Sequence, residues 1–296
     1  MIIFFLTFLV NFLVLYLVLD VVFLFLPPEW DWVDQILLYL EVTPDNVPMM
    51  TTAVVAVTIL VTTTVISYLP FMQSLLCYLN GCRRPSAEEK ALLEKIVEKL
   101  CYHSGKDHKK YNLYVKNDNE FNAFAIGTNN ICVHRGLLYN FSAAEVAGII
   151  AHEMGHIENR DTTYSIGTYA MSSATQIVLS LYLFAVQILS FLIFVPFIGW
   201  FIALFTWFVR IQMLLIEFLL SIPLHLVTMF GSRQQEYAAD KYAYDIGLGR
   251  ELHAALSRLG EIYGEEKQSG FSSLWSTHPE VTKRLIKLED YLAVKG

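Results

Sequence analysis

Three long apolar blocks limit what this chain of 296 residues can fold into. They run from Met1 to Leu26, from about Met49 to Leu69 and from Thr162 to Phe230. Each block is long enough to cross a lipid bilayer, in which backbone polar groups must be satisfied inside helices or closed barrels. Hydrophobic residues make up 55% of the chain and charged residues only 17%, so the sequence predicts an α-rich integral membrane protein.

The third block is nearly seventy residues long and predicts two membrane helices, with a turn near Pro196 and Gly199. The chain would then have four transmembrane helices. Arg210 and Glu217 are the only residues of this block with a full charge, and they lie seven positions apart on nearly the same helix face. They can line a polar chamber, form a structural pair, or bring Arg210 to the far interface.

Charge predicts the orientation of the first two spans. An acidic loop from Glu29 to Asp45 separates them, and the first basic residues of the chain are Arg83 and Arg84, directly after the second span. The positive-inside rule therefore places Arg83 and all that follows in the cytoplasm, with the acidic loop outside. A cleaved signal peptide is the alternative for residues 1–26, but this stretch lacks a positive N-terminal region and a small-residue cleavage site.

From Ser86 onward the pattern is that of a water-soluble α+β domain. Ser86 with Glu89, and Ser142 with Glu145, form two capping boxes that begin helices. Three short runs between these helices predict a small sheet: Tyr111 to Lys116, Phe121 to Ile126 and Ile131 to His134. Further helices are predicted from Gln235 to Ile246, from Arg250 to Tyr263 and after Thr277.

The helix that begins at Ser142 carries the motif H-E-x-x-H, from His152 to His156. Histidines four residues apart lie on one helix face and can bind one zinc ion, with Glu153 beside them as a general base. A catalytic zinc needs a third protein ligand and an open position for water. His134, at a strand end, is either an additional ligand or an ordinary, partly exposed polar residue.

Glu236 is the best candidate for the third ligand. It begins an amphipathic helix, and Asp240 lies one turn further on the same face, where it can accept the second N–H of a ligating histidine. On spacing alone, an exposed acidic pair is the simpler explanation. Membrane topology favours the role of a ligand. Two crossings of the membrane after His156 would bring Glu236 back to the side on which the histidines lie.

The order of these motifs resembles that of the HtpX-like membrane zinc metalloproteases. In that family an H-E-x-x-H motif is followed by an Asn and an Asp, two spans and an E-x-x-x-D helix. The corresponding residues here are His152, Glu153 and His156, then Asn159 and Asp161, then Glu236 and Asp240. Further shared patterns are Asn122-Ala123-Phe124-Ala125, Gly136-Leu137-Leu138, and Thr277-His278-Pro279 with Arg284. The first 80 residues share only the layout of two spans.

The resemblance implies four transmembrane helices with a cytoplasmic, zincin-like α+β metalloprotease domain. One Zn²⁺ per chain would be bound by His152, His156 and Glu236, and the resemblance assigns Asp240 and Asp161 to support of the ligands. The expected parts are two spans with an external acidic loop (1–80), the first half of the protease domain (81–161), a membrane hairpin (162–230) and the second half (231–296).

Other residues have roles that the resemblance leaves open. His278 would donate to the developing oxyanion, or else cap its helix together with Thr277. Arg284 would contact substrate or pair with an acid. The strand that contains Asn122, Ala123 and Phe124 would bind an extended peptide by β-augmentation, although an Asn at a strand start is also a common turn former.

The expected reaction is peptide-bond hydrolysis by zinc-activated water, with Glu153 as the proton acceptor. Membrane or misfolded proteins are the expected substrates, and a bacterial-type plasma membrane is favoured over the endoplasmic reticulum. Two alternatives are processing of C-a-a-X tails on prenylated proteins and a non-catalytic scaffold with structural zinc. The net charge of -7 and the lack of a basic, aromatic stripe exclude nucleic acid as a partner. The sequence leaves the oligomeric state open.

Overall fold

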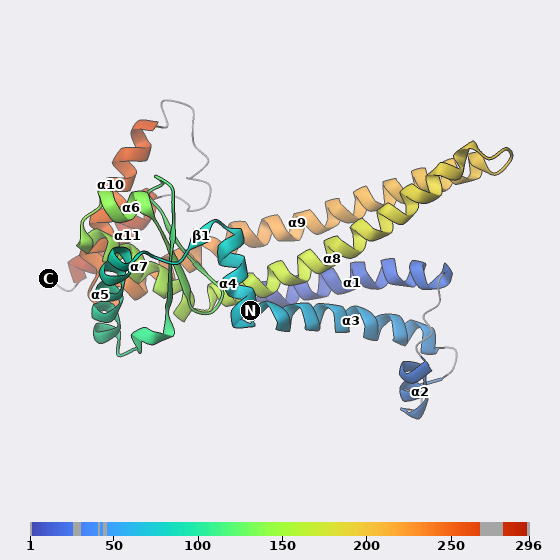
Figure 1. Cartoon of the computed structure of the whole chain (residues 1–296), viewed down its shortest axis with the longest axis horizontal. Helices are drawn as coiled ribbons and strands as arrows, with labels where there is room; N and C mark the ends of the chain where they lie inside the picture. The colour runs from blue at the N-terminus through green and yellow to red at the C-terminus, as the bar shows by residue number, and fades with distance from the viewer. Residues whose placement is uncertain (1, 26–30, 41, 44–45, 267–280, 295–296) are drawn as a thin grey trace. The chain divides into compact units, whose positions relative to one another are not determined.

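The computed structural model describes residues 2–25, 31–40, 42–43, 46–266 and 281–294 (Figure 1). The chain divides into two compact units, each built from two stretches of sequence. One unit comprises Met1–Ser67 with Gly167–Val227, and the other Tyr68–Ile166 with Thr228–Gly296. The first unit contains most of the apolar sequence, and the second contains the sheet and the H-E-x-x-H motif.

Four helices in the described part of the chain are long and apolar enough to cross a membrane, as predicted. The helices are α1 (Ile2–Phe25), α3 (Val47–Ser67), α8 (Asp161–Ser190) and α9 (Gly199–Asp245). Between α8 and α9 lies the short 3₁₀ helix η3 (Phe191–Phe194). Many large apolar side chains of these helices are exposed, as a surface that faces lipid requires.

Two features of these helices and their connections differ from the prediction. Helix α2 (Asp31–Tyr39) lies within the segment predicted as an acidic loop, and the Thr51 hydroxyl donates a 2.8 Å hydrogen bond to its Asp34. Helix α9 continues unbroken to Asp245, so the helix predicted to begin at Gln235 is the last part of α9. Pro223 and Gly231 do not end it, in keeping with the tolerance of long apolar helices for such residues.

The second unit contains a small mixed sheet with the strand order β1-β2-β4-β3. Strand β2 (Asn112–Lys116) pairs with β4 (Asn130–His134) in parallel, and β4 pairs with β3 (Ala123–Ile126) in antiparallel orientation. Strand β1 (Cys82–Arg83) pairs with the other side of β2 and was not predicted, because two residues carry no alternating pattern. Strand β3 is therefore an edge strand.

Several helices of the same unit pack on this sheet or on one another. They are α4 (Pro70–Leu79), α5 (Ala87–Ser104), α6 (Arg135–Asn140), α7 (Ala143–Glu158), α10 (Gly249–Glu266) and α11 (Val281–Val294), with η2 at His108–Lys110. The capping boxes Ser86 with Glu89 and Ser142 with Glu145 are present at α5 and α7, so both predicted helix starts are confirmed. The sequence did not predict α4 and α6, which are short.

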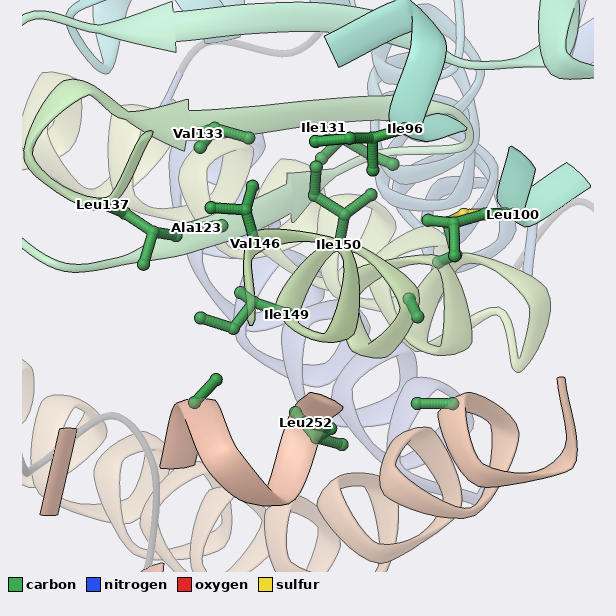
Figure 2. Close-up of a cluster of buried hydrophobic side chains, with 14 of the residues drawn as sticks. Ile96, Leu100, Ala123, Ile131, Val133, Leu137, Val146, Ile149, Ile150 and Leu252 are labelled. Carbon is green, nitrogen blue, oxygen red and sulfur yellow. The ribbon is translucent and has the colours of Figure 1, made fainter. Parts of the chain in front are cut away.

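Helix α7 lies between the sheet and α10 (Figure 2). Val146 and Ile150 point from α7 toward the sheet, where Ile131 is fully buried, whereas Ile149 points toward Leu252 of α10. Burial of both faces removes the central part of α7 from water, since residues 148–155 are all buried. This central helix is the one that carries the H-E-x-x-H motif.

Two glycines of α7 let neighbouring helices approach closely. A Cβ added at Gly148 would lie 2.5 Å from the backbone nitrogen of Leu252 in α10. A Cβ added at Gly155 would lie 2.8 Å from Cα of Ala239 in α9. Because both distances are shorter than van der Waals contact, any side chain there would push a helix away. Gly155 thus sets the distance between the motif and the helix segment around Ala239.

Candidate active site

The candidate active site is built on α7 and the C-terminal part of α9. His152 and Glu153 are 3% and 4% exposed, and His156 follows one turn later on the same face. Glu236 and Asp240, also one turn apart, lie on α9 at 6% and 2% exposure. Charged groups are seldom buried so deeply without a partner. We therefore expect the polar groups on these two helices to pair with one another.

The three expected metal ligands lie together. The Nε2 atoms of His152 and His156 are 3.2 Å apart. The Glu236 carboxylate lies against both rings, with Oε2 3.3 Å from Nε2 of His152 and Oε1 3.5 Å from Nε2 of His156. All three ligand atoms are within 4.8 Å of one another.

These separations fit a tetrahedral zinc ion. Ligand bonds of about 2.05 Å at tetrahedral angles would separate neighbouring ligand atoms by about 3.3 Å. The observed 3.2, 3.3 and 3.5 Å bracket this value, although the two oxygens of Glu236 face different histidines. Two imidazoles and one carboxylate are also a ligand set that zinc prefers in hydrolases. The residues therefore fit the metal that the motif predicts.

Each candidate ligand histidine is held by a carboxylate at its other ring nitrogen. Oδ1 of Asp240 lies 2.9 Å from Nδ1 of His152, and Oδ2 of Asp161 lies 3.1 Å from Nδ1 of His156. A hydrogen bond at Nδ1 orients the ring and leaves Nε2 to face the metal. Both contacts join residues that the sequence assigned to support of the ligands.

The electrostatic field of the site favours a cation. Burial lowers the pKa of His156, but Asp161 and Glu236 outweigh it and raise the pKa to about 10. At His152, burial and Arg284 are likewise outweighed by Asp240 and Glu236, so its pKa lies above the ordinary value. The surrounding carboxylates thus stabilise positive charge between the two rings. A divalent cation would satisfy the same field without protons on the rings.

Arg284 of α11 is a clamp on the two acidic residues of α9. Its Nε donates a 2.9 Å hydrogen bond to Oδ2 of Asp240, and its Nη2 donates to Oδ1 at 2.6 Å. Its Nη1 lies 3.0 Å from Oε2 of Glu236. Arg284 is 2% exposed and pairs with acids, which was one of the two roles left open by the sequence. It also lines the small cavity that adjoins the motif, so its contact with substrate stays a prediction.

A small cavity of about 50 Å³ adjoins the motif. Its polar lining includes Glu153, His152 and Asn122, and Ala123 of β3 also borders it. The Glu153 carboxylate makes no hydrogen bond to another side chain in the described residues, as suits a proton acceptor that faces the cavity. Asn122 precedes β3, and its Oδ1 accepts a 2.9 Å hydrogen bond from the amide of Ala123.

The sequence missed the apolar wall of this cavity. Its members are Phe121, Ile149, Leu252, Leu256 and Leu259. Three of them lie on α10 at helical spacing, which signals a buried face but cannot distinguish a core from the wall of a cavity. Only the packing of α10 on α7 brings these side chains next to Glu153.

Other predicted residues lie elsewhere. Phe124 is not part of the cavity lining and packs edge-on against His134, with ring centroids 5.5 Å apart. His134 is 1% exposed, so the prediction of partial exposure was wrong, because the side chains of Phe124 and Asp118 pack against its ring. It lies with Asp118 and Glu120 rather than with the motif, and Nδ1 is 2.7 Å from Oδ1 of Asp118, a hydrogen-bond distance. His278 lies outside the described residues.

The charged pair predicted in the third apolar block is only half described. Nη2 of Arg210 in α9 donates a 3.0 Å hydrogen bond to Oε1 of Gln187 in α8. The side chain of Glu217 lies outside the described residues. The described contact joins two helices of one unit and does not involve Glu217, so the three predicted roles of Arg210 and Glu217 stay open.

Comparison with known proteins agrees with this geometry. The sequence profile of Peptidase family M48 matches residues 87–292. The chain is 30% identical over 201 residues to a protease HtpX homolog from Acidiphilium cryptum (strain JF-5), which covers 60% of this chain and 66% of that protein. It is 28% identical over 228 residues to a protease HtpX homolog from Pelodictyon phaeoclathratiforme (strain DSM 5477 / BU-1), covering 70% and 74%.

The alignment covers less than two thirds of some relatives. It spans 61% of Protease HtpX from Nitrosococcus oceani, which is 28% identical over 191 residues, and 66% of the Acidiphilium protein. The family profile, however, extends from the start of α5 to α11 and includes the motif, Glu236 and Arg284. The chain therefore belongs to peptidase family M48.

Proposed function

We propose that this protein is a membrane-bound, zinc-dependent endopeptidase. The observation that carries the proposal is the triangle of His152, His156 and Glu236, whose ligand atoms have the separations of a tetrahedral zinc site. Membership of a peptidase family and likeness to proteases named HtpX support the same reaction class. One Zn²⁺ per chain is the proposed cofactor.

When bound, zinc would polarise the scissile carbonyl and lower the pKa of the attacking water. Glu153 would accept the proton from that water and transfer it to the leaving amine nitrogen, so the carboxylate ends the cycle ionised, as it began. Asp240 and Asp161 would keep the Nδ1 protons of the two histidines in place, so that both Nε2 lone pairs face the ion. Arg284 would act as a positioning residue for Glu236 and Asp240.

The substrate would bind as an extended peptide along β3. In the described residues this strand pairs with β4 on one side only, and its first residue, Ala123, borders the cavity beside Glu153. Main-chain hydrogen bonds to an edge strand read little of the substrate sequence. The apolar wall from α10 would add a preference for one aliphatic side chain next to the scissile bond, since its lining offers mainly apolar contacts. Membrane or misfolded proteins are the proposed substrates.

We further propose that the chain crosses the membrane four times with the site facing the cytoplasm. Four candidate spans and the position of Arg83 and Arg84 after the second span support this topology. His278 remains a proposed donor to the oxyanion, by resemblance to the family, and lies outside the described residues.

The full chain purified in detergent, with Glu153→Gln as the variant, tests the activity. Wild type should cleave casein and lose cleavage in a zinc chelator, whereas Glu153→Gln should retain about one zinc per chain, measured by mass spectrometry of the metal, and lose nearly all cleavage. Glu94→Gln, an exposed glutamate on α5, is the matched control and should cleave normally. Full activity of Glu153→Gln would exclude Glu153 as the base, and bound zinc without any cleavage by wild type would favour a scaffold.

A further inference from the structure

Helix α4 exposes a continuous apolar face that the protease site does not use. Phe71, Leu75 and Tyr78 lie at positions i, i+4 and i+7, hence on one side of the helix. With the adjacent Leu79 they are 64%, 44%, 49% and 74% exposed. No residue of α4 carries a charge, and of these four side chains only Tyr78 has a polar group, its hydroxyl.

The opposite face of α4 is built into the protein. Cys77 is fully buried and packs with Cys82, Tyr114 and Cys132. Oε1 of Gln73, which is 2% exposed, accepts hydrogen bonds from the amide and the hydroxyl of Thr128, at 3.0 and 3.1 Å. Helix α4 is therefore held firmly on one face, so its exposed side keeps a defined orientation in this unit.

The covalent chain connects α4 to a candidate membrane span. Helix α3 ends at Ser67 and α4 begins at Pro70, so the two-residue link can extend over about 10 Å at most. The Tyr68 hydroxyl of this link donates a 3.2 Å hydrogen bond to the carbonyl of Thr163, in the first turn of α8, which is another candidate span. The start of α4 thus lies close to the end of α3 and to the first turn of α8.

An arginine and a second aromatic ring lie next to Tyr78 of this face. Arg83 and Arg84, the first basic residues of the chain, follow α4 after three residues, and Arg83 forms an ion pair with Glu89. The Arg84 guanidinium lies 4.6 Å from the centre of the Tyr114 ring, and Tyr78 packs edge-on against that ring at 6.1 Å. Apolar side chains flanked by aromatic rings and arginine are the composition of segments that lie in the headgroup layer of anionic membranes.

The size of the face argues against a protein partner. Four side chains of this size and exposure present roughly 450 Å², whereas a stable protein interface needs about 800 Å² from each partner. Contact with a bilayer surface needs no minimum area, because the candidate spans already hold the chain at the membrane.

We propose that α4 is an interfacial helix that docks on anionic lipid headgroups and acyl ends through Phe71, Leu75, Tyr78 and Leu79. Through Gln73 it is joined to Thr128 in the turn between β3 and β4, so the bilayer orients the edge strand proposed to bind substrate. This second part rests on the proposed function. Its consequence is that peptide segments tethered close to the bilayer are cleaved in preference to free ones.

The lipid contact is measured without reference to activity. The four native cysteines are buried, so a fluorophore on Leu75→Cys labels one site, and Tyr102→Cys, 86% exposed on α5, is the matched control. In nanodiscs of phosphatidylcholine and phosphatidylglycerol, the probe at position 75 should be blue-shifted and quenched by shallow nitroxide lipids, and the probe at position 102 should not. Two results would overturn the lipid contact. One is an emission spectrum at position 75 like that of the probe in water, and the other is blue-shifted emission that nitroxide lipids do not quench.

The orientation of substrate is measured with Phe71→Ser/Leu79→Ser. This variant should lower kcat/KM for a peptide anchored to the vesicle by about fivefold or more and leave the same free peptide unaffected. Equal loss on both peptides, or loss on neither, would overturn the coupling. If wild type cleaves nothing, the proposed function fails, while the quenching result still decides the lipid contact.

Discussion

Nδ1 of His152 lies 2.9 Å from Oδ1 of Asp240, and the same carboxylate is bound by two nitrogens of Arg284. The histidine, the aspartate and the arginine come from three helices that are far apart in sequence. Asp240 is therefore the point at which α7, α9 and α11 are joined beneath the candidate metal site.

Replacement of Asp240 by Asn should weaken metal binding by about 10- to 100-fold, because the amide orients His152 less well and no longer raises its basicity. Competition with a fluorescent zinc chelator measures the affinity. Asp245→Asn, an exposed aspartate paired with Lys241 on the same helix, should bind zinc as wild type does. Unchanged affinity in folded Asp240→Asn would show that the contact does not support the metal.

Replacement of Gly155 by Ala should separate α7 from α9, since the new Cβ would lie 2.8 Å from Cα of Ala239. A shift of a few tenths of an ångström moves Glu236 away from the histidines, so zinc affinity and cleavage should fall together by about tenfold or more. The control is Gly260→Ala on α10, where the new Cβ would meet only Val281 at 3.9 Å. If Gly155→Ala binds and cleaves normally, the close approach is not what sets the geometry.

A larger side chain at Leu259 should restrict the cavity without disturbing the metal. Leu259 is half-buried and lines the apolar wall, so Leu259→Trp should raise KM several-fold for peptides with an aliphatic residue beside the scissile bond. Zinc content should stay at one per chain. Ile286→Trp, at an exposed position of α11, serves as the control for added bulk. Equal KM values in both variants would remove the apolar wall from substrate recognition.

The ion pair of Glu89 with Arg83 should stabilise the second unit in a way that depends on pH. Its hydrogen bonds with Arg83 lower the pKa of Glu89 from 4.5 to about 2. A lowered folded-state pKa contributes stability above pH 4.5, and this contribution is lost as the pH falls from 4.5 to 2.

Glu89→Gln keeps the capping box but loses the charge, so it should cost about 1–2 kcal/mol of unfolding free energy at pH 7. The difference in Tm from wild type, measured in detergent with chelator present, should shrink below pH 4.5. Glu94→Gln, whose pair with Lys90 is exposed, should show almost no difference. A difference in Tm for Glu89→Gln that is constant with pH would contradict the ionic origin.

Much of the fold could be predicted because its signals are local. Apolar blocks long enough to cross a bilayer as helices predicted the four candidate spans, and two capping boxes predicted the starts of α5 and α7. The elements that were missed are short or lack a period. Strand β1 has two residues, α6 has six, and α4 reads as the end of a span until its buried Gln73 and Cys77 are seen. These elements are stabilised by other elements that pack on one of their sides, and the local sequence pattern does not show that packing.

The sequence by itself determined which residues share a helix face: His152 with His156 through their spacing of four, and Glu236 with Asp240 likewise. It could not determine that the two faces meet, because Glu236 is eighty positions beyond His156 in the chain. The tertiary structure decided that, through the close approach of Ala239 to Gly155. It also gave Arg284 its acidic partners, since a buried guanidinium needs carboxylates within hydrogen-bond distance, and only packing of α11 on α9 brings Asp240 and Glu236 there.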